Sequence, residues 1–82
     1  MNMHSKISSR QEFISFLEMF RRDLIENPNE WENKNLEDFL EAMVRYTDDL
    51  QGYYDNTKQT INADIPDWQV FADIFKGARI YE

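Results

Sequence analysis

Apolar side chains recur with the period of an α-helix in the first third of the chain. Four of them follow one another at intervals of four, three and four residues: Phe13, Leu17, Phe20 and Leu24. This spacing places them on one face of a helix. Ser9 and Glu12 form a capping box, in which each side chain satisfies a backbone donor left unpaired at a helix start. The sequence therefore predicts a first helix that begins near Arg10 and ends at Asn27 and Pro28.

A second set of apolar positions with helical period follows a polar connection: Leu36, Phe39, Leu40, Met43, Val44, Thr47 and Leu50. Asn35 is a natural N-cap for this segment, and Asp38 is placed to interact favourably with the positive end of the helix. Charged side chains fall towards the opposite side: Glu37, Glu41, Arg45 and Asp48. Gly52 can adopt the left-handed backbone geometry that ends many helices. A second helix is therefore predicted from about Leu36 to Gly52.

Residues 53–65 lack this pattern and are rich in side chains that favour turns, so they are predicted to form a loop, with a β-hairpin as the alternative. Pro66 and Asp67 mark a third helix start, followed by a short apolar face: Trp68, Phe71, Ala72 and Phe75. Gly77 should close that helix, and residues 79–82 are expected to be either a packed tail or a short strand. Because each helix has one apolar face that must meet another, we predict an all-α, three-helix domain.

The 82 residues show no second compositional region, so residues 1–82 are expected to form a single domain, with residues 1–9 as a disordered N-terminus. The chain contains no cysteine, which leaves no disulfide framework and no thiolate metal site. Its first twelve residues are too poor in apolar side chains for a signal peptide or a membrane span. We therefore expect a cytoplasmic protein that does not contact membranes.

The formal net charge of −7 is unevenly distributed. Seven acids stand against two basic residues between positions 30 and 49: Glu30, Glu32, Glu37, Asp38, Glu41, Asp48 and Asp49. Such a field repels nucleic-acid phosphates and attracts basic proteins, so nucleic-acid binding is not expected. Exposed aromatic rings beside acids are typical of protein interfaces, because the rings contribute affinity and the carboxylates speed association. The expected partner-binding residues are Trp31, Glu37, Glu41, Asp48, Asp49, Tyr53, Tyr54, Asp55 and Asn56.

Three of these residues are aromatic side chains in or beside predicted connections. Trp31 is expected either to cap the end of the helix bundle or to anchor a partner. For Tyr53 and Tyr54, one ring is expected to pack inside and the other to be presented at the surface.

No catalytic or metal-binding arrangement is indicated. His4 is the only histidine, and a catalytic base so close to the chain end would lack the packing that orients it. Four oxygen-bearing side chains lie within nine residues: Asp48, Asp49, Asp55 and Asn56. A calcium loop counted from Asp55 would place Thr60 and Pro66 where glycine and glutamate are required. We expect no catalytic residue, no metal site and no cofactor.

Several short motifs resemble a family of small bacterial proteins of unknown function. They are W-x-N-x-x-L-x-x-FLEA at residues 31–42, GYY-x-N at residues 52–56 and P-x-W-x-x-FA at residues 66–72. The resemblance runs from about residue 30 to the C-terminus. It implies a bacterial, single-domain, non-secreted protein and brings no activity with it.

These observations favour a non-enzymatic binding protein that masks a basic surface of a partner protein, in the manner of an immunity protein or antitoxin. Small acidic immunity proteins offer an analogy of size and charge. One alternative is a small enzyme or ligand-binding domain whose pocket lies by the 53–65 loop, with Asp49, Tyr53 and Asn56 as polar groups. Another is a homodimer whose aromatic patch is covered by a second copy.

Overall fold

The computed structural model describes residues 6–82. Its elements are α1 (Arg10–Glu26), the short 3₁₀-helix η1 (Pro28–Glu30), α2 (Leu36–Asn56) and α3 (Trp68–Ala78). No strand occurs in this part of the chain. The predicted all-α, three-helix fold is confirmed, and the alternative of a hairpin between the second and third helices is wrong.

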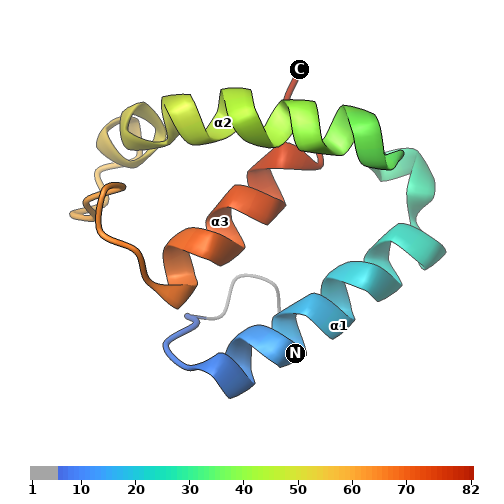
Figure 1. The fold of residues 1–82 in the computed structure, drawn as a ribbon, viewed down its shortest axis with the longest axis horizontal. Coiled ribbons are helices and arrows are strands. Elements are labelled where there is room, and N and C mark those ends of the chain that lie inside the picture. Colours follow the sequence, from blue (N-terminus) through green and yellow to red (C-terminus); the bar gives the residue numbers. More distant parts are fainter. Residues whose placement is uncertain (1–5) are drawn as a thin grey trace.

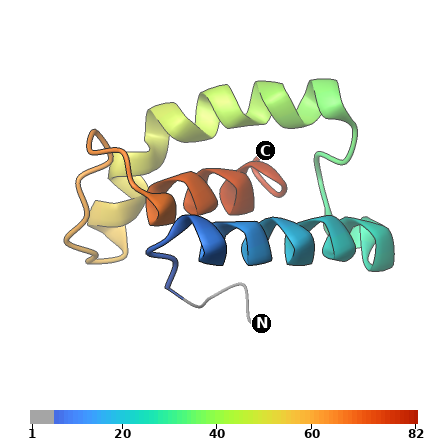
Figure 2. The same cartoon turned by 60° about the horizontal axis from the view of Figure 1, so that its bottom comes forward.

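The third helix lies between the other two. α1 and α2 are joined at one end by residues 27–35 and spread apart from there, with α3 inside the angle (Figure 1). Seen from another side, α2, α3 and α1 follow one another with α3 in the middle (Figure 2). α3 packs on both outer helices, whereas no Cα atoms of α1 and α2 approach within 8 Å. The domain is flattened, with principal extents of 32, 28 and 19 Å.

All three helices begin at the predicted residues. Each is preceded by a polar N-cap in extended backbone geometry: Ser9, Asn35 and Asp67. The Asn35 side chain accepts a hydrogen bond from the N–H of Asp38 at 2.9 Å, and Asp67 accepts one from Val70 at 2.8 Å. Each bond satisfies a backbone donor that has no partner within the helix, which is why a local signal sets these boundaries.

The capping box at the start of α1 involves two serines. Ser9 accepts a hydrogen bond from the N–H of Glu12 at 3.1 Å, and the Glu12 carboxylate accepts one from the N–H of Ser8 at 2.9 Å. The pKa of Glu12 is lowered, mainly by this Ser8 N–H bond, because the bond favours the charged carboxylate.

The segment before α1 differs from the predicted disordered N-terminus. Its first five residues, with His4 among them, lie outside the described residues. At residues 6–9 the chain is held in place, because Ile7 is buried and its N–H donates to the Gln69 side chain at 2.7 Å. Within the described residues, Ile7 is therefore part of the packed core.

The predicted end of α2 at Gly52 is wrong, because the helix continues to Asn56. Gly52 is exposed within the helix, and the left-handed geometry expected there is found at Lys58, with φ of 59°. The continuation buries Tyr54 completely. The free energy of burying an aromatic ring exceeds the cost of about 1 kcal/mol for a glycine inside a helix. Tyr53 and Tyr54 therefore lie on the last turns of α2 and not in a loop.

Gly77 was predicted to close the third helix, and it lies one residue before the end of α3. Its structural role is different. Its φ is not positive, so it does not supply a left-handed turn. A Cβ at this position would overlap the Tyr46 ring of α2. The absence of a side chain therefore allows α2 and α3 to approach closely.

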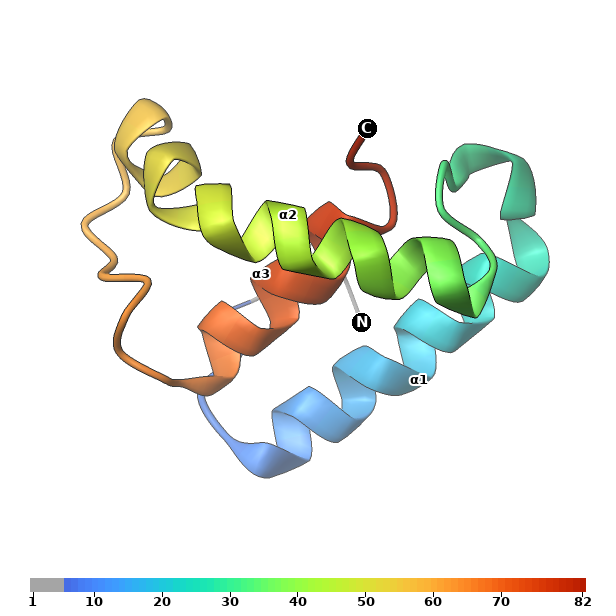
Figure 3. The ribbon, with the colours of Figure 1, turned by 45° about the horizontal axis from the view of Figure 1, so that its top comes forward.

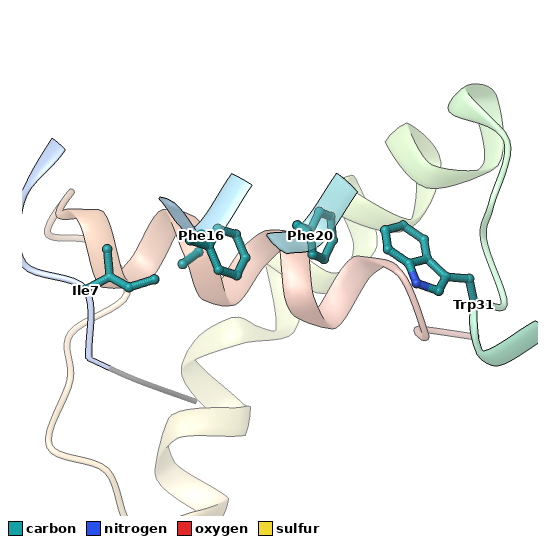
Figure 4. Packing of buried hydrophobic residues seen from close by; sticks show 5 residues of the cluster. Ile7, Phe16, Phe20 and Trp31 are labelled. Atoms are coloured by element: carbon teal, nitrogen blue, oxygen red, sulfur yellow. The ribbon is translucent and has the colours of Figure 1, made fainter. Parts of the chain in front are cut away.

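The core divides along the two sides of α3. On the α1 side, Ile7, Phe16, Phe20 and Trp31 lie in a row along α3 and pack with Ala72 (Figure 4). On the α2 side, the buried cluster contains Leu50, Tyr54 and Val70. The short third helix thus contributes to both clusters. α1 and α2 also meet directly through Phe20 and Phe39, whose ring centroids lie 6.1 Å apart.

Residues 79–82 form a turn and a packed tail, which settles the alternative left open by the sequence. The tail returns towards α2 (Figure 3). The Asn33 amide donates to the carbonyl groups of Ala78 and Tyr81 at 2.9 and 2.7 Å. The Arg79 carbonyl accepts from the N–H groups of Glu32 and Asn33 at 2.9 and 3.0 Å. These bonds join the chain end to the connection between α1 and α2.

Candidate functional site

The nine residues predicted to bind a partner separate into an exposed group and a buried group. Seven are exposed along α2: Glu37, Glu41, Asp48, Asp49, Tyr53, Asp55 and Asn56. Trp31 and Tyr54 are buried. A partner can therefore contact the first group in this conformation, whereas the two buried rings hold the framework on which that group is displayed.

Trp31 joins three segments of the domain. Its ring lies 4.7 Å from that of Phe20, centroid to centroid, and its indole N–H donates to the Asp23 carboxylate at 2.8 Å. The same carboxylate forms an ion pair with Arg79 at 3.2 Å. Of the two roles expected for Trp31, the structure shows the packing role at the end of the bundle.

Tyr54 and Tyr53 divide as the sequence predicts, with one ring inside and the other outside. The Tyr54 hydroxyl donates to the Asp73 carboxylate at 2.7 Å. Asp73 also accepts from the Gln69 amide at 2.9 Å and pairs with Lys76 at 3.2 Å. Burial, followed by the hydrogen bond to Asp73, raises the pKa of Tyr54 well above its usual range. Tyr54 therefore remains a neutral donor and links α2 to α3.

The exposed residues form two rows along α2, because residues three, four or seven apart share one side of a helix. One row is Glu37, Glu41 and Asp48, and Asp55 continues it seven residues further on. The other row is Asp49, Tyr53 and Asn56. Arg45 pairs with Glu41 at 3.5 Å, in an exposed contact that contributes little to stability. The predicted acidic surface is therefore divided between two edges of the helix.

The row that contains Tyr53 borders a cleft of about 380 Å³ between α2, α3 and the C-terminal tail. The Tyr46 ring lies 6.1 Å from Tyr53 and 5.3 Å from Tyr81, centroid to centroid. The Tyr81 hydroxyl donates to the Asp49 carboxylate, and this hydrogen bond raises the pKa of Tyr81. Burial raises the pKa of Tyr46 to about 12. We call this space the tyrosine-lined cleft, because Tyr46, Tyr53 and Tyr81 line it. Charged side chains line it as well: Asp73, Lys76, Arg79 and Glu82.

A neighbouring hollow of about 370 Å³ lies beside the loop that follows α2. Tyr53, Asp73 and Lys76 line both this hollow and the tyrosine-lined cleft. Asp49 and Asn56 are not among the residues that line either space. The three polar groups expected to form a pocket near residues 53–65 do not converge, because only Tyr53 faces the concave surface.

The acidic row is accompanied by an apolar row that the sequence does not distinguish from the core. Leu36, Leu40 and Val44, four residues apart on α2, are 72%, 50% and 71% exposed. Leu36 directly precedes Glu37, and Leu40 directly precedes Glu41. Large apolar side chains on the surface of a monomer are usually scattered singly, so a continuous row marks a candidate contact surface.

This apolar row meets a groove between α1 and α2. We use "apolar groove" for the space of about 410 Å³ whose apolar lining is Leu17, Phe20, Leu24, Trp31, Leu36 and Phe39. Arg21 and Lys34 also line it. Phe39 stacks on Phe75 with ring centroids 6.1 Å apart, and Phe75 lines a second apolar hollow of about 280 Å³ over α3. Phe39 of the apolar groove and Phe75 of this second hollow are thus in ring contact.

Residues 9–82 match the family of unknown function DUF7660. The chain belongs to this family. Comparison with curated proteins and with solved structures gives no match. Within residues 6–82, no three acidic or histidine side chains are grouped so that they can hold a metal ion. None of the helices in the same range is long and apolar enough to cross a membrane.

The sequence of this DUF7660 member indicates the charges of the surface but not the exposed apolar row on α2. Leu36, Leu40 and Val44 belong to the stripe that was expected to face other helices. The sequence signal that could separate them from the buried members of the stripe is its width. α2 carries more apolar positions than the short α3 can cover. Two of the three directly precede an acid of the exposed row, which places them at the edge of the stripe.

Proposed function

We propose that this DUF7660 member is a non-enzymatic, acidic protein-binding domain that masks a basic surface of a partner protein, in the manner of an immunity protein or antitoxin. The observation that supports the proposal most strongly is the pairing of two exposed rows on α2. The acidic row is Glu37, Glu41 and Asp48, and the apolar row beside it is Leu36, Leu40 and Val44. A bacterial origin and a cytoplasmic location belong to the same proposal.

The two rows supply complementary contributions to binding. A leucine or valine side chain that is fully removed from water contributes about 1.5–3 kcal/mol, so the apolar row provides affinity. Exposed carboxylates contribute less to affinity, but their field attracts basic proteins and raises the association rate. Tyr53 adds an exposed ring on the other edge of the same helix. This combination favours a basic protein over nucleic acid, which the net charge of −7 repels.

Affinity purification from native host cells tests the proposal. We expect a specific basic protein to be retained and to be released as salt is raised, because salt screens exposed charges. A variant with Glu37→Gln, Glu41→Gln and Asp48→Asn should retain less of it. A control of equal net charge, with Glu26→Gln, Glu30→Gln and Asp64→Asn, neutralises exposed acids outside the two rows on α2 and should retain the partner. Retention of no specific protein, or equal loss in both variants, would contradict the proposal.

A second candidate function is the binding of a small molecule in the tyrosine-lined cleft. The cleft and its neighbouring hollow share Tyr53, Asp73 and Lys76, which gives this region both aromatic and polar groups. A fragment screen by NMR would support small-molecule binding in this cleft if ligands shifted the signals of Tyr46, Tyr53 and Gly77 together. Ligands that bind elsewhere, or not at all, would leave protein binding as the better explanation.

A further inference from the structure

Exposed apolar side chains from all three helices lie where α1 and α2 spread apart (Figure 1). Leu17 of α1 and Leu36 of α2 line the apolar groove, and Phe71 of α3 lines the second apolar hollow. Helical spacing places further apolar residues beside Leu17 and Leu36. The exposed set is Ile14, Leu17, Leu36, Leu40, Val44 and Phe71. Apolar surface gathered in this way marks an interface, because exposed apolar side chains on a monomer are normally scattered singly.

The edge of α1 beside this surface is basic. Arg10, Ile14, Leu17 and Arg21 follow one another at intervals of four, three and four residues, so they share one side of the helix. All four are exposed, and Arg21 lines the apolar groove together with Leu17. Neither arginine forms an ion pair with any of residues 6–82. Their charges are therefore available to another molecule.

The corresponding edge of α2 is acidic. Glu37 directly follows Leu36, Glu41 directly follows Leu40, and both acids are exposed. Arg21 lies five residues before the end of α1, and Glu41 lies five residues after the start of α2. At 1.5 Å per residue, each is about 7.5 Å along its helix from the ends that residues 27–35 join. The basic and acidic positions therefore lie at matching heights on the two helices.

These two edges are complementary when two copies of the chain meet face to face. Pairing α1 with α1 would bring arginines together, and pairing α2 with α2 would bring carboxylates together. A twofold arrangement that lays α1 of each copy on α2 of the other forms both contacts of opposite charge at once. The net charge of −7 opposes association at long range, so the apolar contacts must supply the affinity while the charged edges select the orientation.

We propose that this surface is covered by a second copy of the chain, in a twofold dimer in which α1 of each copy lies along α2 of the other. Exposed apolar side chains of one copy fill the apolar groove and the second hollow of the other, and Arg21 of each copy pairs with Glu41 of the other. This inference goes beyond the proposed function and does not rest on it. Because both use the rows on α2, a basic partner would have to replace the second copy.

The mass of the full chain in solution tests the dimer. We expect sedimentation equilibrium to approach twice the mass of 9.9 kDa as the concentration is raised. NMR spectra of dilute and concentrated samples should differ at the amide signals of Leu17, Leu36 and Phe71. A monomer at every concentration up to about 1 mM, which would reveal even a weak dimer, would overturn the inference. Differences confined to Tyr46 and Tyr81 would assign the contact to the tyrosine-lined cleft and would overturn it as well.

Matched substitutions test the apolar contacts. Leu40 is 50% exposed in the apolar row, and Ile80 is 52% exposed in the C-terminal tail. Each dimer contains two copies of every contact, so Leu40→Gln should raise the Kd of the dimer about a hundredfold, whereas Ile80→Gln should leave it unchanged. Because both side chains are exposed, circular dichroism should show that both variants fold. Equal Kd values for the two variants would contradict the proposed interface.

Exchange of charges tests whether α1 pairs with α2. Arg21→Glu would place carboxylates opposite one another, and Glu41→Arg would place basic groups opposite one another, so each variant alone should dimerise about tenfold more weakly. An equal mixture of the two variants restores both contacts of opposite charge and should dimerise as the wild type does. Arg22→Glu is the matched control, because it changes the net charge equally at an exposed neighbour outside this side of α1. A mixture no more dimeric than its components, or an equal loss in Arg22→Glu, would refute the orientation.

The same measurements separate this inference from the proposed function. If the chain stays a monomer while native cells provide a basic partner, the inference fails and the proposed function stands. If the dimer forms with these properties and native cells provide no basic partner, the proposed function fails and the inference stands.

Discussion

The hydrogen bond between Tyr54 and Asp73 allows a direct test of how α2 is attached to α3. The Tyr54 ring is completely buried, and its hydroxyl donates to the Asp73 carboxylate at 2.7 Å. Tyr54→Phe removes this donor and keeps the ring, so the packing of the core changes little. Tyr53→Phe is the matched control, because the neighbouring ring is exposed.

The expected magnitude follows from the surroundings of Asp73. A hydrogen bond to a charged group contributes about 1.5–3 kcal/mol to the free energy of unfolding. After Tyr54→Phe, Asp73 retains the Gln69 amide at 2.9 Å and the Lys76 ammonium at 3.2 Å. The carboxylate is therefore not left without partners, which places the loss in the lower part of this range, at about 2 kcal/mol. For a domain of this size, such a loss lowers the Tm by about 8–16 °C.

Urea denaturation of the wild type and both variants at pH 7 measures this difference. We expect Tyr54→Phe to lower the midpoint without a change in the m-value, and Tyr53→Phe to change the free energy of unfolding by less than about 0.5 kcal/mol. If Tyr54→Phe were as stable as Tyr53→Phe, the hydrogen bond would not hold α2 to α3, and the reasoning would be refuted.

Three further predictions concern the helix contacts, the helix caps and the tyrosines. Gly77→Ala should destabilise the domain by about 1–3 kcal/mol, because the new Cβ would overlap the Tyr46 ring. Gly52→Ala should stabilise the domain by about 0.5–1 kcal/mol, since no atom lies within 4 Å of a Cβ there. Urea denaturation of both variants would contradict this prediction if the two effects had the same sign. Asn35→Ala should lower the free energy of unfolding by about 1 kcal/mol through loss of the cap on α2, and an unchanged urea midpoint would speak against that role. The pKa of Tyr46 is raised to about 12 in the folded chain, whereas it is about 10 in the unfolded chain. The resulting contribution to the free energy of unfolding is complete below about pH 10 and should be lost as the pH rises from about 10 to 12. Urea denaturation at pH 9 and pH 11 checks this effect. The free energy of unfolding should fall less between these two pH values in Tyr46→Phe than in the wild type, and an equal fall would contradict the prediction.

The helix starts show what local sequence is able to specify. Ser9, Asn35 and Asp67 cap the three helices because each side chain accepts a hydrogen bond from the backbone N–H three residues further on. Such bonds require no distant contact, so the beginnings of the helices, their number and the all-α class follow from the sequence. The negative charge of α2 follows as well, because the composition of an exposed helix face is independent of packing.

The end of α2 and the roles of the aromatic residues depend on contacts that are distant in sequence. Gly52 remains helical because the continuation buries Tyr54 and brings it to Asp73, nineteen residues further along the chain. Trp31 is buried because Phe20 and Asp23 of α1 meet it beside the end of α3. An aromatic residue near a connection has the same local sequence signal whether it packs inside or faces solvent.

The exposed apolar row on α2 is the clearest case of a feature decided by tertiary structure. The periodicity of α2 identifies Leu36, Leu40 and Val44 as part of an apolar stripe but does not say which members of the stripe are covered. Coverage depends on the position of α3, which lies between α1 and α2 and is about half as long as α2. The sequence by itself determined where the helices start, their N-caps and the charge of α2, because these depend on neighbours along the chain. Only the three-dimensional packing decided which apolar surface remains exposed, because burial depends on how completely one helix covers another.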